Sequence, residues 1–496
     1  MTVAVNHAFP AGLALETHKQ RALTSTILVL PPPGTAVLSL EQGFSGAVVE
    51  PVVAVGAEVA VGTPVAQPHD ERATTLHSPV SGRVTAIEPR PAATVTGTAT
   101  CIVIESDGRD RRDPAWRASA DVESLSSTEL VARLRAAGIA GLGGAAFPTA
   151  TKLEAARARG ARRLLLNGAE CEPWICCDDA LMREQAQDIL HGARLMMRAL
   201  EADSCVIAIE DDKPDAIAAV RAAIAATGPA SGFAVQVVPA IYPQGAERQL
   251  ATAVTGAEVP TAGLPADIGI TCQNVATAMS VARWAREGEP CIARVVTVTG
   301  SGVAGPRNVL ARIGTPLATL VDAAGGYCDT PLRLIAGGNM TGRALGSDDA
   351  GLSKAINCIL VATAADLQPR LTAVELPCIR CGDCAAVCPV ALLPQQLHRA
   401  ALADDEAGLL AHGLWDCIDC GCCDFVCPSQ IPLAHRFRIA RRSLREREDT
   451  RRKAAEARER HERHERRVRE AAEAERHAFE HARARARGLQ SDQDRP

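Results

Sequence analysis

The sequence predicts a multidomain protein of α/β and α+β domains that ends in a charged helix. Its 496 residues are too many for one domain and suit several. The first hundred residues alternate short valine-rich stretches with glycine turns, the centre alternates helical and strand-like patterns, and a cysteine-rich segment precedes an Ala-, Arg- and Glu-rich tail. We expect five segments with boundaries at residues 1–115, 121–290, 294–363, 366–436 and 437–496.

Residues 1–115 have the pattern of a small all-β domain. Runs rich in β-branched residues, such as 47–53 and 61–65, are separated by glycine turns, which is typical of a barrel or sandwich. The pattern resembles the barrel-sandwich of lipoyl or biotinyl carrier domains, in which a lysine at a hairpin tip takes the prosthetic group. Residues 72–76, just before His77, include no lysine. We therefore expect docking rather than carrier function, and a structural role for His77.

Residues 121–290 are expected to form an α/β domain, because an amphipathic stretch at 127–137 alternates with strand-like runs. The glycine-dense loop 138–149 feeds a helix that contains Lys152. Glycines let backbone N–H groups approach a phosphate, and a helix N-terminus favours its negative charge. The loop matches G-x-G-x-x-A but follows a helix rather than a strand, which argues against a standard dinucleotide fold. A phosphate site and a plain tight turn are both consistent with it.

Three polar segments follow in this domain, at residues 164–173, 241–248 and 273–277. The first lies at the end of an apolar strand, where open α/β sheets bind ligands. Each segment alone is more typical of a solvated loop or a helix cap than of a site. Residues 294–363 combine a strand-like run at 295–300 with a helix-like stretch at 316–324, which indicates an α+β module.

The cysteine-rich segment repeats one pattern, C-x2-C-x2-C-x3-C-P. Its members are Cys378, Cys381, Cys384 and Cys388 in the first run, and Cys417, Cys420, Cys423 and Cys427 in the second. This run holds [4Fe–4S] clusters in two-cluster ferredoxins, where the last cysteine of each run binds the other cluster. We therefore expect Cys427 to complete the first-run cluster and Cys388 the second-run cluster. Zinc is the alternative, but a zinc ribbon leaves no role for the third cysteine and the Cys-Pro. Two clusters predict one-electron transfer.

The other ten cysteines show no repeated interval and read as small buried residues, and Cys422 as a bystander within the second run. Residues 1–20 lack a basic stretch followed by an apolar core, which predicts a reducing, cytoplasmic compartment. No apolar run approaches the roughly 20 residues of a membrane-spanning helix. Any membrane role is expected to be peripheral.

The net charge of -5 hides an asymmetry, because residues 436–496 carry 20 Arg and Lys against 13 Asp and Glu. The stretch 439–487 is expected to form a long solvated helix, and its basic excess favours an anionic membrane surface as one possible partner. A plain solvated or partly disordered tail is the other reading. With 4 Trp, 2 Tyr and 7 Phe in the chain, we expect no nucleic-acid partner.

The order of these pieces resembles the C subunit of the Rnf electron-transport complex, and the centre is similar to the flavin subunit of respiratory complex I. The resemblance implies FMN, NAD(H) and two [4Fe–4S] clusters as cofactors, and a β-grasp module at 294–363. It also implies that the glycine loop and the three polar segments hold FMN and NADH. The residues concerned are Gly141, Gly143, Gly144, Phe147, Lys152, Asn167, Glu170, Glu172, Gly245, Glu247, Asn274 and Thr277.

Four positions depart from the complex I pattern: Ala146 replaces a glycine, and Ala169, Ala246 and Ala276 replace acidic residues. The leading hypothesis is a translocase-type NADH- and ferredoxin-linked oxidoreductase subunit, peripheral on the cytoplasmic side of the cell inner membrane. Its expected partners are the other Rnf subunits, NADH, and ferredoxin through a partner subunit. The chief alternative is an iron–sulfur electron wire or scaffold with an empty nucleotide site. A soluble ferredoxin-dependent oxidoreductase is a second alternative.

Overall fold

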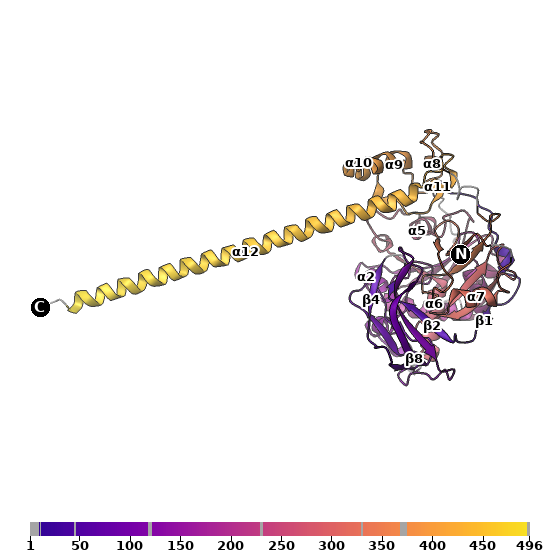
Figure 1. The fold of residues 1–496 in the computed structure, drawn as a ribbon, viewed down its shortest axis with the longest axis horizontal. Coiled ribbons are helices and arrows are strands. Elements are labelled where there is room, and N and C mark those ends of the chain that lie inside the picture. Colours follow the sequence, from indigo (N-terminus) through magenta and orange to yellow (C-terminus); the bar gives the residue numbers. More distant parts are fainter. Residues whose placement is uncertain are drawn as a thin grey trace. The chain divides into compact units, whose positions relative to one another are not determined.

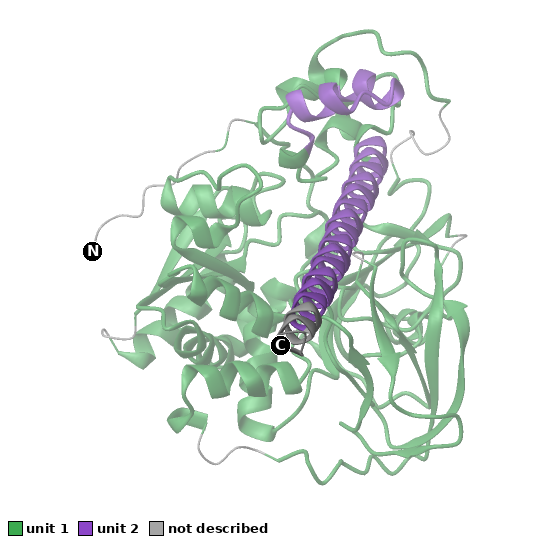
Figure 2. Ribbon diagram, turned by 90° about the vertical axis from the view of Figure 1, so that its left-hand side faces the viewer, with its two compact units in different colours: residues 1–396, 415–434 green, residues 397–414, 435–496 purple. Residues whose placement is uncertain are grey.

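The computed structural model describes residues 9, 11–43, 46–117, 122–228, 232–328, 331–367 and 374–493, with side chains up to residue 485. It comprises two compact units, residues 1–396 with 415–434 and residues 397–414 with 435–496 (Figure 2). Residues 1–8 and 10, part of the segment on which the prediction of a cytoplasmic compartment rests, and residues 494–496 of the predicted tail lie outside the described residues.

The predicted barrel-sandwich is present in the first unit as two four-stranded sheets. Their orders are β2-β9-β8-β5 and β3-β4-β6-β7. The strands are β2 (Thr35–Ser39), β3 (Glu41–Gln42), β4 (Ala47–Pro51), β5 (Glu58–Val59), β6 (Pro64–Pro68), β7 (Leu76–His77), β8 (Gly82–Pro91) and β9 (Thr98–Ser106). The two sheets enclose a core of aliphatic side chains that includes Val49, Val84 and Ile102, because alternate residues of each strand point inward.

The described start of the chain, before Thr35, lies outside these two sheets. β1 (Leu28–Val29) pairs in parallel with β15 (Arg307–Arg312) of the third domain. Upstream, Leu13 exchanges backbone hydrogen bonds with Tyr242, and the amide of Trp174 donates to Thr17 O at 2.7 Å. The short run 28–30, Leu-Val-Leu, is apolar like many strands, but only tertiary contacts decide which sheet it joins.

The α/β domain has one parallel four-stranded sheet in the order β12-β11-β10-β13. The strands are β10 (Arg163–Gly168), β11 (Ser204–Glu210), β12 (Phe233–Val238) and β13 (Ile270–Asn274). The helices are α1 (Ser127–Ala136), α2 (Thr149–Ala158), α3 (Cys177–Leu200), α4 (Pro214–Thr227), α5 (Glu247–Thr255) and α6 (Val275–Glu287) (Figure 1). A Cβ at Gly192 of α3 would lie 1.7 Å from Ala278 O, so this glycine lets α3 and α6 pack backbone against backbone.

The third domain is a mixed sheet in the order β1-β15-β14-β18-β16-β17, with one helix, α7 (Leu317–Ala323). Its further strands are β14 (Ala293–Thr299), β16 (Arg333–Ala336), β17 (Arg343–Leu345) and β18 (Cys358–Ala362). Strand and helix agree with the expected α+β module. Buried Lys354 ties three regions together, because its ammonium donates to Thr74 Oγ1, Thr75 O and Gly138 O at 2.7 to 3.0 Å.

The cysteine runs form two short loops, each entering a short helix, α8 (Asp383–Ala386) and α11 (Cys422–Val426). Between them lie α9 (Pro394–Leu402) and α10 (Glu406–Ala411), and after them α12 (Leu433–Gln493). Within the second unit, Arg447 and Arg451 of α12 pair with Asp404 and Glu406 at 2.6 to 2.9 Å. All side chains from residue 448 to 485 are exposed, as expected of a solvated helix.

Among the described residues, no helix has both the length and the apolar character needed to span a membrane.

Candidate functional site

The candidate site lies at the carboxyl edge of the parallel sheet. From β10 the chain runs through α3 to β11 and β12, and it returns through α5 to β13 on the other side of β10. This reversal of strand order opens a crevice between the carboxyl ends of β10 and β13, where open α/β sheets bind ligands. Asn167 and Asn274, at those two strand ends, are paired in register.

A cavity of about 200 Å³ lies at this edge. Six of the twelve residues predicted to hold FMN and NADH line it: Gly143, Asn167, Glu170, Glu172, Gly245 and Asn274. Ligand pockets usually measure about 300 to 1,000 Å³, so this cavity is smaller than a typical one. Gly143, in the adjoining glycine loop, is exposed.

Residues of α6 and of the end of β13 contact the glycine loop and hold it in place. Thr277, fully buried, accepts a hydrogen bond from the Leu142 amide through Oγ1 at 2.9 Å. A Cβ at Gly143 would lie 3.2 Å from Asn274, so a side chain there would press on that amide. Ala146, which stands where the resembled family has glycine, has a left-handed φ of 52°. Glycine adopts that conformation more readily than alanine. The loop nevertheless has this left-handed conformation with alanine at the position.

The two asparagines are held by hydrogen bonds on either side of the crevice. Asn167 donates through Nδ2 to Gly245 O at 2.8 Å and accepts from the Ala169 amide at 3.1 Å. Asn274 caps α6 by accepting from the Ala276 amide at 2.8 Å. These bonds tie the ends of β10 and β13 to the segment that precedes α5.

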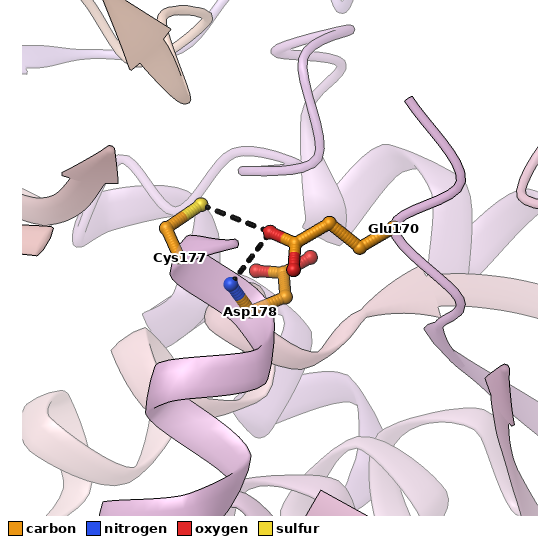
Figure 3. Close-up of side chains that lie close together, drawn as sticks. All are labelled: Glu170, Cys177 and Asp178. Carbon is orange, nitrogen blue, oxygen red and sulfur yellow. Dashed lines mark hydrogen bonds between the residues drawn. The ribbon is translucent and has the colours of Figure 1, made fainter. Parts of the chain in front are cut away.

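Glu170 caps α3. Its left-handed backbone, with φ 54°, turns its carboxylate onto the first turn of the helix. Oε1 accepts from the Asp178 amide at 2.7 Å, and Oε2 accepts from the Asp179 amide at 3.1 Å. Figure 3 shows Cys177 Sγ directed at the same carboxylate, at 3.4 Å. The predicted cofactor residue is therefore also a helix cap, a position that favours a negative charge.

Glu172 connects the cavity to the third domain. Its Oε1 accepts from the amides of Met340 and Thr341 at 2.8 and 2.7 Å, and its Oε2 accepts from the Thr341 hydroxyl at 2.6 Å. Burial raises the pKa of the carboxyl, and these hydrogen bonds oppose the rise. Much of its hydrogen-bonding capacity is therefore used by the protein itself.

The other predicted residues lie outside the cavity lining. Lys152 and Glu247 form an ion pair at 2.7 Å. Burial disfavours the Lys152 charge, but the Glu247 carboxylate outweighs it and raises the lysine pKa. The Gly141 amide donates to Phe147 O at 2.8 Å, and the Phe147 side chain is 42% exposed. Gly144, with φ 115°, has open space where a Cβ would be.

Several lining residues were missed by the sequence analysis, among them Asp178, Tyr242 and Thr341. Tyr242 lies within the polar segment 241–248, and its position next to Pro243 gave no sign of its contacts. Asp178 reads in the sequence as an ordinary acidic residue in the first turn of a helix. Thr341 comes from another domain, about 170 residues away from Glu172 along the chain, and no local pattern signals it.

The second cysteine loop forms part of the same cavity, because Ile418 and Cys420 are among its lining residues. The Tyr242 hydroxyl donates to Cys420 O at 2.5 Å. Nearby, Arg248 pairs with Asp416 at 3.3 Å, and the Gln249 amide donates to Pro389 O at 2.9 Å. The segment that starts α5 thus holds the cysteine loops against the sheet edge.

The end of the first run lies among the cysteines of the second. Burial raises the pKa of the Cys423 thiol, and the charges of Asp424, Cys417, Cys420 and Cys388 raise it further. The Cys388 thiol, whose pKa is raised by burial, also interacts with Cys420. Cys388 therefore lies near the second-run thiols.

The end of the second run lies next to the start of the first. The amide of Leu376 donates to Ser429 O at 2.9 Å, and the Ser429 hydroxyl donates to Pro377 O at 2.9 Å. Cys427 is two residues before Ser429, and Cys378 directly follows Pro377. These contacts bring the end of the second run to the start of the first. The ligand sets themselves remain a prediction.

Four family models match consecutive parts of the chain. They are the RnfC barrel sandwich hybrid domain at residues 7–109, the Nuo51 FMN-binding domain at 134–283, the SLBB domain at 295–344 and the 4Fe-4S dicluster domain at 376–431. With the fold and the cavity, these matches define an electron-transfer protein that combines a flavin-binding domain with an iron–sulfur domain.

Curated relatives give the particular family. The C subunit of an ion-translocating oxidoreductase complex from Rhodobacter capsulatus is 40% identical over 438 residues, 88% of this chain and 83% of its own. The C subunit of the corresponding complex from Pseudomonas aeruginosa is 45% identical over 455 residues, 91% of this chain. The chain belongs to the family of C subunits of ion-translocating oxidoreductase complexes, the Rnf family expected from the sequence.

The chain spans 57% of the length of the Pseudomonas relative and 52% of that of the C subunit from Erwinia tasmaniensis, which is 42% identical. Among solved structures, an NAD+-reducing [NiFe]-hydrogenase in the air-oxidized state aligns with 60% of this chain and 57% of its own, at 20% identity and a TM-score of 0.44.

Proposed function

We propose that this chain is the electron-input subunit of an ion-translocating oxidoreductase complex and passes electrons between NAD(H), FMN and two [4Fe–4S] clusters. One observation carries the proposal: Cys420 lines the same cavity as the residues expected to hold FMN. A flavin bound there would link two-electron hydride chemistry to the one-electron transfer that the clusters require. The protein would bind and orient the flavin and keep the distance for electron transfer to the cluster short.

The glycine loop is proposed to bind the flavin phosphate. Its exposed Gly143, the open Cβ position of Gly144 and the start of α2 place backbone amides and a helix N-terminus together. Lys152 is held beside this loop by Glu247, which keeps the ammonium charged. Exposed Phe147 offers an aromatic face on which a nicotinamide ring stacks.

The cysteines are proposed to hold two clusters with crossed ligands. One takes Cys417, Cys420, Cys423 and Cys388, and the other takes Cys378, Cys381, Cys384 and Cys427. The first of these adjoins the cavity through Cys420 and would exchange electrons with the flavin. The other includes Cys378 and Cys381, which are exposed, and would exchange electrons with a partner.

The membrane complex is the proposed setting. Other Rnf subunits are the proposed partners, with ferredoxin reached through one of them, on the cytoplasmic side of the inner membrane. The names of the relatives support a multisubunit complex. The basic start of α12 is proposed to add contact with an anionic surface.

Anaerobic purification followed by cofactor analysis and NADH titration tests the proposal. About one flavin per chain, bleached by NADH before reduced-cluster signals appear in electron paramagnetic resonance, is the expected result. Clusters without flavin or any NADH response would contradict it and favour an electron wire. Ala246 in the cavity wall, where the related flavin subunit has an acidic residue, is the observation that favours this second function.

A further inference from the structure

The first turn of α3 places two buried carboxyl groups at the cavity. Asp178 lines the cavity and is 6% exposed, and Asp179 is 5% exposed. Side-chain ligand atoms of Glu170, Cys177 and Asp178 lie within 4.8 Å of one another (Figure 3). The carboxyl groups of Glu170 and Asp178 and the thiol of Cys177 thus lie close together.

The Asp178 carboxyl is only half satisfied. Oδ2 accepts from Asn274 Nδ2 at 2.6 Å, whereas Oδ1 is buried without a hydrogen-bond partner among the described residues. An ionised carboxylate is costly in such a position, and the neutral acid is less so. A neutral carboxyl also has an O–H to donate, which an ionised one lacks.

We propose that Asp178 holds a proton beside the cofactor cavity and exchanges it with solvent as the charge of a bound flavin changes. This inference rests on the proposed function. An electron that enters the cavity adds negative charge beside Asp178, which favours the neutral acid, and an electron that leaves favours release of the proton. The proton comes from solvent and returns to it, and no bond to the flavin forms or breaks. Asp178 thus adjusts the charge beside the flavin without reacting with it, which makes it a positioning residue rather than a catalytic one.

The charged surroundings of Asp178 agree with this role. Burial raises its pKa to about 8, together with the charge of Glu170. The Asn274 hydrogen bond and the charges of Arg294 on β14 and Lys213 before α4 act in the opposite direction. The titratable Cys177 thiol, on the same turn of α3, also lies close to the Asp178 carboxyl.

Further carboxyl groups share the charge of Lys213 with Asp178. Burial raises the pKa of Asp179 to about 6 and that of Glu210 to about 7. The Lys213 ammonium lies 2.7 Å from Glu210 and 2.6 Å from Asp212. The Asp212 side chain is 25% exposed. We infer that Asp178 exchanges its proton with solvent on the side of this charged group, where Asp212 is partly exposed.

Infrared titration of the flavin-free full chain tests the protonation by itself. We expect the wild type to show a protonated-carboxyl band that disappears around pH 8, and Asp178→Asn to lack it. Asp178→Glu keeps a carboxyl and should retain such a band. Asp188→Asn, on the same helix but paired with Arg286 outside the cavity, should leave the band unchanged. An unchanged band in Asp178→Asn would overturn the assignment.

Redox titration of the full chain with bound FMN tests the coupling. The flavin midpoint potential of the wild type should fall more steeply with pH around pH 8 than that of Asp178→Asn, and Asp188→Asn should match the wild type. Equal slopes in all three proteins would overturn the coupling. If FMN does not bind, the proposed function fails, and the infrared result still decides whether Asp178 holds a proton.

Discussion

At the residue scale, the cavity depends on hydrogen bonds between segments that are distant in the sequence. Thr277 could be predicted as a site residue from its resemblance to a family motif, but its position shows a supporting role. Its hydroxyl holds the Leu142 amide, and through it the glycine loop. Sequence patterns identify such polar residues without telling whether they contact a ligand or a neighbouring loop.

Replacing Thr277 by Val should destabilise this loop. The buried Leu142 N–H would lose its acceptor, at a cost of about 1–3 kcal/mol, and FMN affinity should fall with it. Urea unfolding and fluorescence titration with FMN measure the two effects. Thr227→Val is a matched control, because that hydroxyl bonds Ile224 O at the end of α4. Unchanged FMN affinity in Thr277→Val would contradict the supporting role.

The raised pKa of Asp178 also makes a stability prediction. The folded state keeps this proton up to about pH 8, whereas the unfolded state releases it near the ordinary value of 3.8. The stabilisation from this group is therefore fully present below pH 3.8 and is lost as pH rises toward 8. The urea midpoint of Asp178→Asn, relative to wild type, should rise across this interval. A constant difference between the two proteins would show that Asp178 ionises normally.

At the scale of elements, the cysteine spacing predicted the two loops, and the fold brings their ends together. Ser429 bonds the backbone before Cys378, and Cys388 interacts with Cys420 and Cys423. The repeat could be predicted because ligand spacing within a short loop is a local property. The contact of the second loop with the sheet edge could not, because it depends on side chains of the segment before α5.

Single cysteine variants test the crossed assignment. Cys388→Ser should remove the second-run cluster and Cys427→Ser the first-run cluster, so that each loses about half of the iron. Iron analysis and electron paramagnetic resonance of anaerobically purified protein distinguish them. Cys422→Ser is the control and should retain both clusters. Loss of the same cluster in the Cys388 and Cys427 variants would refute the crossed pattern.

Tyr242 connects the cavity to the second-run loop. Tyr242→Phe removes the hydrogen bond to Cys420 O, at a cost of about 0.5–1.5 kcal/mol, and should loosen the loop against the sheet edge. Stopped-flow reduction by NADH should show normal flavin bleaching followed by severalfold slower cluster reduction. Tyr327→Phe, which loses a bond to Asp348 in the third domain, should behave as wild type. Equally fast cluster reduction in both variants would argue against this connection.

At the scale of the whole molecule, the basic excess of the tail is concentrated at its start. Residues 436–453 have 9 Arg and Lys against 3 acidic residues, whereas residues 454–496 have 11 against 10. Truncation after residue 453 should therefore preserve binding to anionic lipid vesicles. Changing Arg442, Arg452 and Lys453 to Gln should weaken it by up to about a hundredfold, at about 1 kcal/mol per charge.

Vesicle sedimentation at low and high salt measures this binding, with neutral vesicles as the control. Flavin and iron contents should not change in either variant, because all three substituted side chains are exposed or partly exposed on α12. If the truncated chain loses vesicle binding while the triple variant keeps it, the basic start of α12 is not the membrane contact.

The sequence by itself determined the family, the order of domains, the cysteine repeat and the long charged helix. The family and the order of domains follow from the resemblance of the sequence to known proteins. The repeat and the helix follow from local spacing and composition, which a chain carries in any environment. Only the tertiary structure decided that β1 joins the third domain and that Thr341 engages Glu172. It also decided that Asp178 and Cys420 line one cavity. Such contacts arise from packing between distant segments, and burial there gives ordinary residues properties that their sequence neighbours do not reveal.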